Sequence, residues 1–520
     1  MERPGPAGRH LDRISALPDE LLHVILSFLG DAPAVTRTAA LSRRWRHVWT
    51  GATNLTFKDS NMNPPMNKSQ FFAGFVDWVL ARRASTETDM ESLMIHLTQD
   101  TEKGRIEKAC PSPEQLNEWL RYAARHVTKS VHIHLNPSRQ VVVELPSHGR
   151  AASTFLHLPY YRFRFPAAAE SRYQALTDLM LSSLSFDEDA GGSTLRDFVA
   201  CSCPRLRRLL VCNPQGLRQL VLRSKVLEEF TISVAMDLQF LDVAAPNLRV
   251  IDLYSCFGRL QVQPGSNDDK LVRIAAPKLE KIVSMNYFRN KPTDLDIHDL
   301  KSVRRLAELK LEMHGKYHWD KDVSFWLLEN CPSVEHVDAY LLHGACTEVA
   351  MDEQLVDLTS QGRAPFAKVR TMVVRASYFP KDHFVASMSS LLVRCPHLTS
   401  LSIWIWPSSV REKTWSCFCD VLTDKWQIHG NVALESLEDV NITGFGGTEE
   451  EMQFVRLLFE SSSSIKHMTL VHAAAAKKKE GEEPDRKDIE RVYHELVNAA
   501  DLGSWRLAEK TFIWTCDATS

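Results

Sequence analysis

The chain lacks the features that mark several large classes of protein. Its net charge is only -3 over 520 residues, so no overall charge draws it to nucleic acid or to an anionic membrane surface. No apolar run reaches the roughly 18 residues of a membrane-spanning helix. The N-terminal MERPGPAGRHLDR has no hydrophobic stretch typical of a secretory signal. We therefore expect a cytoplasmic or nuclear protein whose partners include neither membrane nor nucleic acid.

Catalytic and metal-binding motifs are missing as well. The sequence has no Gly-rich phosphate loop, no nucleophile elbow and no HExxH. The pairs Cys201/Cys203 and Cys417/Cys419 have only one residue between them, whereas structural zinc prefers wider steps in two pairs. The odd count of 11 cysteines fits buried thiols in a reducing compartment better than a disulfide set. We predict no catalytic residue, no metal site and no cofactor.

What the sequence does contain is ample material for a core, because 44% of its residues are hydrophobic. A chain of this length forms either more than one compact unit or an array of repeats.

The stretch from residue 12 to about residue 50 is unusually apolar for so small a unit. Leu17-Pro18-Asp19-Glu20-Leu21-Leu22 predicts the start of a helix, because proline suits the first helical position and acids favour the helix dipole there. Apolar residues then cover most of that helix instead of one stripe. Trp45, Val48 and Trp49 share one face of a later helix. A unit of about 40 residues rarely folds alone, so we expect another chain, or the rest of this one, to cover it.

This stretch resembles an F-box, and most closely the plant form. The matching residues are Leu17-Pro18-Asp19-Glu20-Leu21-Leu22, Ile25, Leu26, Leu29, Leu41-Ser42-Arg43-Arg44-Trp45-Arg46 and Trp49. The resemblance implies a three-helix module over residues 12–58 that docks on the Skp adaptor of an SCF (Skp–cullin–F-box) ubiquitin ligase. Residues 1–11 would form a flexible N-terminus. Ten residues would bind Skp or form the module's core, two roles that the pattern does not separate: Leu17, Pro18, Leu21, Leu22, Ile25, Leu26, Leu41, Ser42, Trp45 and Trp49.

A repeating pattern of the form apolar-x-x-apolar-x-apolar fills the middle of the chain. It starts at residues 206, 217, 227, 238 and 248, so two steps make a coil of 21 residues. The alternation of its last two apolar positions is typical of a strand. Beyond this region the intervals lengthen and include helical patterns, for example before Cys331-Pro332 and before Cys395-Pro396. Stacked units of this kind bury one continuous core, and residues 59–433 resemble the irregular leucine-rich repeats of plant F-box proteins.

The C-terminal part resembles the FBD region of many plant F-box/leucine-rich-repeat proteins. The matching segment, residues 434–472, includes Leu437, Val440, Ile442, the glycine-rich Gly444–Gly447 loop and a helix through Leu458. Thr448 and Glu451 have the spacing of a capping box, which predicts that this helix begins at the following residue. We expect residues 473–488 to form a charged loop, followed over residues 489–520 by a helix and a strand from Lys510 to Trp514.

These patterns predict an α/β chain in which a small three-helix F-box precedes an irregular leucine-rich-repeat solenoid. By the resemblance, its F-box would bind a Skp-type adaptor and, through it, cullin, while the repeats bind an unidentified protein substrate. Such a subunit catalyses nothing; it raises the effective concentration of a target lysine near the ubiquitin-conjugating enzyme. Two alternatives remain open: an F-box interaction scaffold acting outside a ubiquitin ligase, and a solenoid that holds a small molecule.

Overall fold

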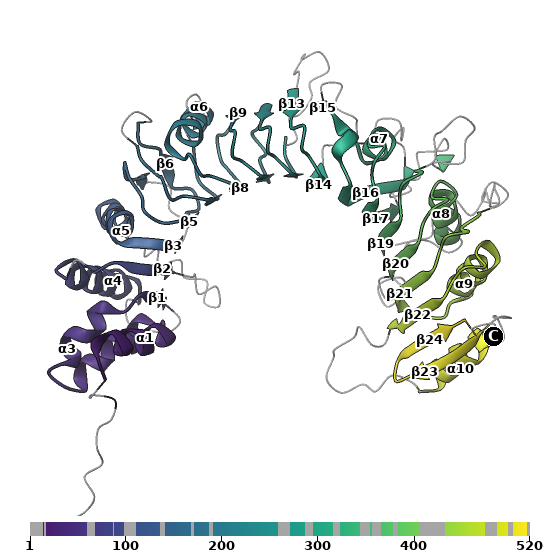
Figure 1. Ribbon diagram of the computed structural model, residues 1–520, viewed down its shortest axis with the longest axis horizontal. Coiled ribbons are helices and arrows are strands. Elements are labelled where there is room, and N and C mark those ends of the chain that lie inside the picture. The colour runs from purple at the N-terminus through teal and green to yellow at the C-terminus, as the bar shows by residue number, and fades with distance from the viewer. Residues whose placement is uncertain are drawn as a thin grey trace, which may run out of the picture. The chain divides into compact units, whose positions relative to one another are not determined.

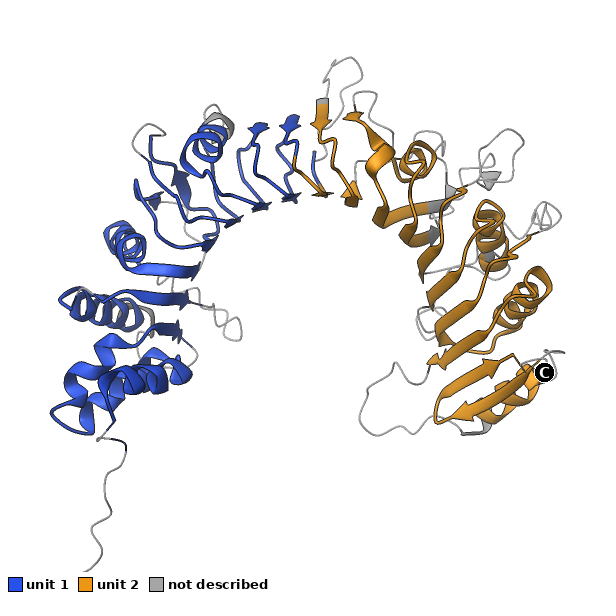
Figure 2. Ribbon diagram, in the orientation of Figure 1, with its two compact units in different colours: residues 1–246, 256–269 blue, residues 247–255, 270–520 orange. Residues whose placement is uncertain are grey.

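The structure is a computed structural model of the 520-residue chain. It describes residues 14, 17–59, 68–86, 88–97, 111–135, 141–167, 171–186, 191–257, 271–285, 295–315, 323–343, 354–355, 366–377, 383–405, 432–473, 486–497 and 503–516. The expected flexible N-terminus, the second Cys-x-Cys pair and most of the expected charged loop lie outside these residues. The chain divides into two compact units, Met1–Pro246 with Cys256–Asp269, and Asn247–Ser255 with Lys270–Ser520 (Figure 2).

Unit 1 begins with a small helical module that matches the predicted pattern closely. Its elements are α1 (Asp19–Leu29), α2 (Ala32–Arg37), a 3-10 turn Thr38–Ala40, α3 (Trp45–Val48) and a 3-10 turn Trp49–Gly51 (Figure 1). Pro18 lies one residue before the helix instead of at its first position. Gly30 ends α1 with a positive φ of 60°, and the Asp31 carboxylate accepts a hydrogen bond from the Ala34 N–H at 3.1 Å to start α2.

Seven parallel strands of unit 1 form one sheet directly after this module. They pair in the order β1 (Asn54–Lys58), β2 (Met90–His96), β3 (Val127–His134), β5 (Ser153–His157), β7 (Asp178–Ser182), β8 (Arg208–Cys212) and β10 (Glu229–Ser233). Buried and half-buried residues alternate along these strands, so one face meets the core and the other faces outward.

The 21-residue coil is confirmed: each turn carries two short strands and no helix. Alternate strands belong to different sheets, because β8 pairs with β10 whereas β9 (Gln219–Arg223) pairs with β11 (Phe240–Ala244). Earlier in unit 1, β4 (Val142–Glu144) pairs with β6 (Arg162–Arg164). After the helical module, the described helices of this unit are α4 (Lys68–Ala84), α5 (Pro113–His126) and α6 (Gly191–Asp197). A π turn, Phe198–Ser202, follows α6.

Unit 2 repeats the same principle with longer intervals. Its parallel strands pair in the order β12 (Val250–Tyr254), β14 (Lys281–Met285), β16 (Arg305–Gly315), β17 (His336–His343), β19 (Thr371–Ser377), β20 (Ser400–Ile405), β21 (Asp439–Phe445) and β22 (His467–His472). β18 (Gln354–Leu355) pairs antiparallel with the end of β16, and β13 (Leu271–Ala275) pairs with β15 (Leu295–His298), which a 3-10 turn Leu300–Ser302 follows. Helices α7 (Val323–Asn330), α8 (His383–Leu392) and α9 (Glu449–Ser461) occupy the longer intervals, as predicted.

The C-terminal end differs from the expectation in two places. Helix α10 (Arg486–Val497) begins inside the segment expected to be a loop, and the expected single strand is a hairpin of β23 (Ser504–Ala508) and β24 (Thr511–Thr515). β24 pairs antiparallel with β22, which ends the run of parallel strands. The antiparallel partner was missed because the polar, charged segment before Lys510 alternates less clearly than the strand after it.

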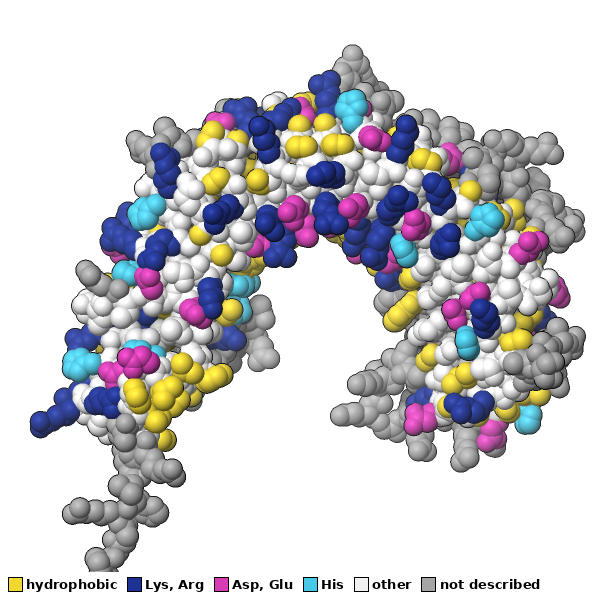
Figure 3. All heavy atoms as spheres, in the orientation of Figure 1, with side chains coloured by type: hydrophobic (Ala, Val, Ile, Leu, Met, Phe, Trp, Pro, Cys, Tyr) yellow, Lys and Arg dark blue, Asp and Glu magenta, His cyan; other side chains and the backbone are white. Residues whose placement is uncertain are grey.

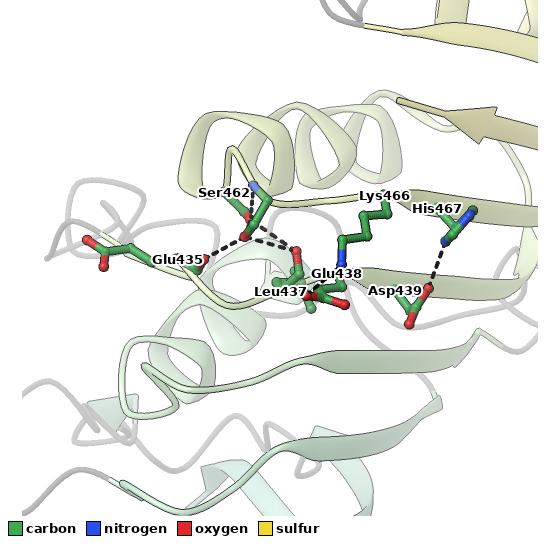
Figure 4. A network of polar contacts seen from close by, with 8 residues as sticks. Glu435, Leu437, Glu438, Asp439, Ser462, Lys466 and His467 are labelled. Atoms are coloured by element: carbon green, nitrogen blue, oxygen red, sulfur yellow. Dashed lines mark hydrogen bonds and ion pairs between the residues drawn. The ribbon is translucent and has the colours of Figure 1, made fainter. Parts of the chain in front are cut away.

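The segment 434–472 is tied together by polar contacts at its two turns (Figure 4). The Ser464 hydroxyl donates to the Glu435 carbonyl at 2.6 Å, and the Ser462 hydroxyl donates to the Leu437 carbonyl at 3.3 Å. Lys466 Nζ lies 2.8 Å from Glu438 Oε1 across the neighbouring strands. The serine run after α9 therefore fixes where β22 begins, beside β21.

The core consists of the repeated apolar positions, with cysteines at the turns before them. Cys203, Cys331 and Cys395 are all buried, and burial raises the pKa of each thiol to about 12. They act as small apolar side chains, as the sequence predicts. Gly444, the second-last residue of β21, has φ 84°, and a Cβ there would lie 1.9 Å from the Ile405 carbonyl oxygen, so only glycine fits.

Candidate protein-binding surface of the N-terminal module

Exposed apolar side chains concentrate on the N-terminal module. Of the fourteen large hydrophobic residues that are exposed in the described part of the chain, seven lie between residues 14 and 41. Figure 3 shows hydrophobic side chains gathered over the helices of this module. We call this surface the apolar patch; its members are Ile14, Leu21, Val24, Ile25, Phe28, Leu29 and Leu41. A patch of this kind on a folded module is typical of a protein-binding site.

The spacing along α1 explains how one helix serves both the core and the patch. Leu22 and Leu26, four residues apart, are fully buried. Leu21, Ile25 and Phe28 follow a similar spacing on an adjacent, outward side of the helix and are exposed, Phe28 by 85%. A helix that is apolar nearly all round is thereby half covered by its own chain, and its other half meets solvent.

The ten residues singled out from the sequence divide between interior and surface. Leu22, Leu26, Trp45 and Trp49 are buried inside the module and do not reach its surface. The exposed ones are Pro18, Leu21, Ile25, Leu41 and Ser42, and Leu17 is half-buried. Ser42 also has a local role, because its hydroxyl accepts a hydrogen bond from the Trp45 N–H at 3.4 Å. Burial thus separates the residues that form the module's interior from those that reach its surface.

Four members of the patch were not singled out from the sequence: Ile14, Val24, Phe28 and Leu29. For Val24 and Phe28 the signal was present, since both lie on the helix face opposite the Leu22–Leu26 pair. Leu41, which is 68% exposed, follows the 3-10 turn after α2.

Arg44 holds the start of α1 against the segment that leads into α3. Its Nε donates to Asp19 Oδ1 at 2.9 Å, and its Nη2 donates to the Leu17 carbonyl at 2.6 Å. Asp19 also favours the positive end of the α1 dipole. Both charged side chains are partly exposed, so the contribution to stability is modest. The main effect of this contact is to fix the direction in which the chain enters helix α1, which carries most of the patch.

The module is continuous with the first repeats of unit 1. β1 leaves the module and pairs with β2, while the Thr56 N–H donates to the Gly30 carbonyl at 2.7 Å. Trp49 stacks on Trp78 of α4, with ring centroids 5.6 Å apart, and Phe75 extends the aromatic contact to Phe57 of β1. These contacts fix the apolar patch relative to the outward face of the unit 1 sheet.

That outward face carries a row of histidines. His96, His134 and His157 occupy matching positions on β2, β3 and β5, with ring centroids 4.5 Å and 4.1 Å apart. Partial burial, and then the neighbouring imidazoles, lower the pKa of His134 to about 4. Burial lowers the pKa of His157 too, and its Nδ1 lies 2.9 Å from the Ser182 hydroxyl oxygen. His134 and His157 are therefore uncharged at neutral pH.

Other kinds of site find no support in the described residues. These residues hold no group of three or more His, Cys, Asp or Glu side chains placed to bind a metal ion. No helix within the described ranges combines the length and apolar character required to cross a membrane.

Comparison with known families agrees with the architecture. An F-box-like family model matches residues 14–50, and a model of the LRR repeats of an FBD-associated F-box protein matches residues 116–300. An FBD model matches residues 433–470, the segment of the polar turns described above. The chain is a plant F-box/LRR/FBD protein. The apolar patch therefore lies on its F-box.

Similar full-length proteins come from Arabidopsis thaliana. The one named "Putative F-box/FBD/LRR-repeat protein At4g03220" is 25% identical over 487 residues, covering 88% of this chain and 89% of its own. "F-box/FBD/LRR-repeat protein At1g13570" is 22% identical over 472 residues, covering 89% and 92%. "F-box/LRR-repeat protein 25" is 48% identical, but over 58 residues, which are 11% of this chain and 22% of its own.

Proposed function

We propose that this protein is the substrate-recognition subunit of an SCF ubiquitin ligase, in which the F-box binds a Skp-type adaptor and the leucine-rich repeats bind a protein substrate. The observation that carries the proposal is the apolar patch. A folded module that exposes six apolar residues within residues 21–41 gains from a partner that buries them. Each residue that becomes fully covered contributes about 1–3 kcal/mol, enough in sum for a specific complex.

Burial divides the Skp-facing role among the residues of the module. Leu21, Ile25, Phe28 and Leu41 would contact the adaptor directly. Leu22, Leu26, Trp45 and Trp49 would act from the interior, by holding α1 and α3 in place beneath the contact surface. Pro18 and Leu17, at the start of α1, are placed to contribute at the rim.

The role of the complex is to bring two proteins together without chemistry in this chain. A substrate bound to the repeats would be held near the conjugating enzyme that a cullin recruits, which raises the effective concentration of its lysines. The F-box and the first repeats are joined by the aromatic contact of Trp49 with Trp78, so a substrate bound to those first repeats would not swing freely relative to the F-box. Action in the cytoplasm or the nucleus is part of this proposal.

The decisive experiment is reconstitution with a Skp-type adaptor, cullin and a ubiquitin-conjugating enzyme. The wild-type chain should co-purify with the adaptor, and the assembled complex should transfer ubiquitin. Leu21→Asp and Phe28→Asp should no longer co-purify with the adaptor, although their circular dichroism spectra stay unchanged. Adaptor binding without ubiquitin transfer would instead identify an interaction scaffold outside a ligase. Unchanged adaptor binding in both variants would remove the patch from the interface.

A further inference from the structure

The outward face of the unit 2 sheet bears a row of aromatic and cationic side chains that the F-box proposal does not use. Lys310, Tyr340, Arg375 and Trp404 stand at matching positions on the adjacent strands β16, β17, β19 and β20. Tyr254 of β12 joins them, because Lys310 Nζ lies 5.7 Å from the centre of its ring. We call these five residues the aromatic–cationic strip.

Two aromatic side chains of the strip are exposed to solvent, where a partner could contact them. Trp404 is 53% exposed and Tyr254 41%, which makes them the only two large hydrophobic side chains exposed on this face within the described residues. Trp, Tyr and Arg are the residue types that contribute most to protein interfaces. Neighbouring strands are about 4.8 Å apart, so the four adjacent strands span about 14 Å, the length of four or five extended residues.

Part of the strip is held rigid by contacts within the sheet. Arg375 forms an ion pair with Asp338, and its guanidinium carbon lies 5.1 Å from the centre of the Tyr340 ring. Burial lowers the pKa of Arg375, but the hydrogen bond and charge of Asp338 outweigh this and raise it overall. Tyr340 and Arg375 are therefore ordered before any partner arrives, which reduces the entropy lost on binding.

Within the described residues, the charges that reach solvent on this face without an ion pair are cationic. Lys310 and Arg305 are exposed, and neither forms an ion pair within the described parts of the chain. The carboxylates of Asp252, Glu308 and Asp338 are half-buried, and the last is already matched by Arg375, while the exposed Asp439 of β21 lies 3.1 Å from His467 Nδ1. A partner is thus offered an unpaired positive charge at one end of the four-strand row and an exposed indole at the other.

We infer that the aromatic–cationic strip binds an extended protein segment in which an Asp or Glu side chain lies about four residues from an aromatic or large aliphatic one. The carboxylate would pair with Lys310, and the apolar side chain would pack on Trp404, with Tyr340 and Arg375 between them. That this segment belongs to a ubiquitylation substrate rests on the function proposed above; the binding itself does not.

The test uses the full chain to select from a random peptide library displayed on phage. The selected peptides should be enriched in Asp or Glu about four residues from an aromatic or large aliphatic residue. A synthetic peptide of the selected sequence should lose at least about tenfold in affinity towards Lys310→Glu and towards Trp404→Ala, measured by fluorescence anisotropy. Lys301→Glu, an equal charge change on an exposed lysine of the same unit away from the strip, should bind as wild type does.

A charge exchange makes the test sharper. A peptide whose acidic residue is replaced by lysine should bind poorly to wild type and regain affinity for Lys310→Glu. Selected peptides without acidic residues, or peptides that bind both strip variants like wild type, would overturn the inference. So would a concentration-dependent dimer in sedimentation that Trp404→Ala abolishes, because a second copy would then cover the strip.

The strip variants should keep full binding to the Skp-type adaptor, since their substitutions lie in unit 2 and the apolar patch in unit 1. Failure of adaptor binding by the wild-type chain, with peptide binding intact, would refute the proposed function and leave the strip standing. Intact adaptor binding without peptide binding would refute the role of the strip and leave the proposed function standing.

Discussion

The indole of Trp49, buried in the F-box, stacks on the indole of Trp78 in α4 with 19° between the ring planes. One ring belongs to the module that carries the apolar patch and the other to the helix of the first repeat. Trp78 is half exposed and covers one side of the buried Trp49 ring. This contact and the pairing of β1 with β2 make the F-box part of unit 1 and not a separate domain on a linker.

Replacing Trp78 by alanine should therefore loosen the F-box without touching the patch. We expect Trp78→Ala to lower the free energy of unfolding by about 1–2 kcal/mol, because it removes an aromatic stack and exposes Trp49. Urea denaturation of the full chain measures the loss. Met236→Ala, which truncates a comparably exposed side chain elsewhere in unit 1, serves as the control and should change stability by less than about 0.5 kcal/mol. Equal effects of the two changes would show that the stack contributes nothing.

Stability and adaptor binding should separate between the two faces of α1. Leu26→Ala leaves a cavity beneath the helix and should cost about 2–5 kcal/mol of stability. Ile25→Ala, its neighbour on the outward face, should leave the denaturation midpoint nearly unchanged and weaken the complex with the adaptor several-fold. Isothermal titration and urea denaturation of both variants give the four values. If Ile25→Ala destabilised the chain as much as Leu26→Ala, the assignment of faces would be wrong.

The sequence could predict elements whose periodicity is strong. The alternating positions Leu209/Val211 and Phe230/Ile232 predicted strands, and these residues are buried in β8 and β10. The pattern could not show that β9 pairs with β11 in a separate sheet, since strand partners depend on how the coils stack and not on local spacing. β23 was missed for a related reason: a hairpin strand that packs on one side leaves a weak signal.

The candidate site was predictable in its location but not in its division. The apolar composition of residues 17–49 pointed to the region that exposes apolar side chains, but the pattern could not distinguish Leu21, which is exposed, from Leu22, which is buried. Their roles depend on where Trp45 and Val48 approach the helix, which is a tertiary fact. The strip on unit 2 had no sequence signal at all, because Lys310 and Trp404 are far apart in the chain and meet only through strand register.

The histidine row predicts a loss of stability in mild acid. The pKa of His134 is about 4 in the folded chain and about 6.5 in the unfolded one, so the unfolded state binds more protons between these values. Stability should fall as the pH drops from 6.5 towards 4. His134→Gln should reduce the difference between the urea midpoints at pH 7 and pH 5, whereas the exposed His397→Gln should not. A rise in stability on acidification that His134→Gln removes would contradict the sign.

The buried thiols should be inert towards alkylation. Burial raises the pKa of Cys203, Cys331 and Cys395 to about 12, so almost no thiolate forms at pH 8, and solvent does not reach the sulfur. Iodoacetamide at pH 8 should modify the exposed Cys201 and Cys516 first, with the three buried thiols reacting only in urea. Peptide mass spectrometry resolves the sites. Modification of Cys203 as fast as of Cys201, two residues away, would show that this turn opens in the folded state.

The capping box of α9 offers a test of the FBD segment. Glu451 is buried, and its Oε2 accepts hydrogen bonds from the Gly446 N–H at 2.9 Å and the Thr448 N–H at 3.1 Å, while the Thr448 hydroxyl accepts from the Glu451 N–H at 3.3 Å. Glu451→Ala leaves two partly buried N–H donors without this acceptor and should cost about 1–3 kcal/mol. Glu449 lies two residues earlier and is largely exposed, so Glu449→Ala should cost less than about 0.5 kcal/mol of stability.

The two glutamate variants carry the same change of charge near the same helix start, so the comparison removes the dipole effect. Urea denaturation gives the stabilities, and hydrogen exchange of the amides from Gly446 to Glu451 locates the effect. Faster exchange of the Gly446 and Thr448 amides in Glu451→Ala alone is the expected pattern. Equal exchange in both variants would mean that the glycine-rich turn holds its shape without the buried carboxylate.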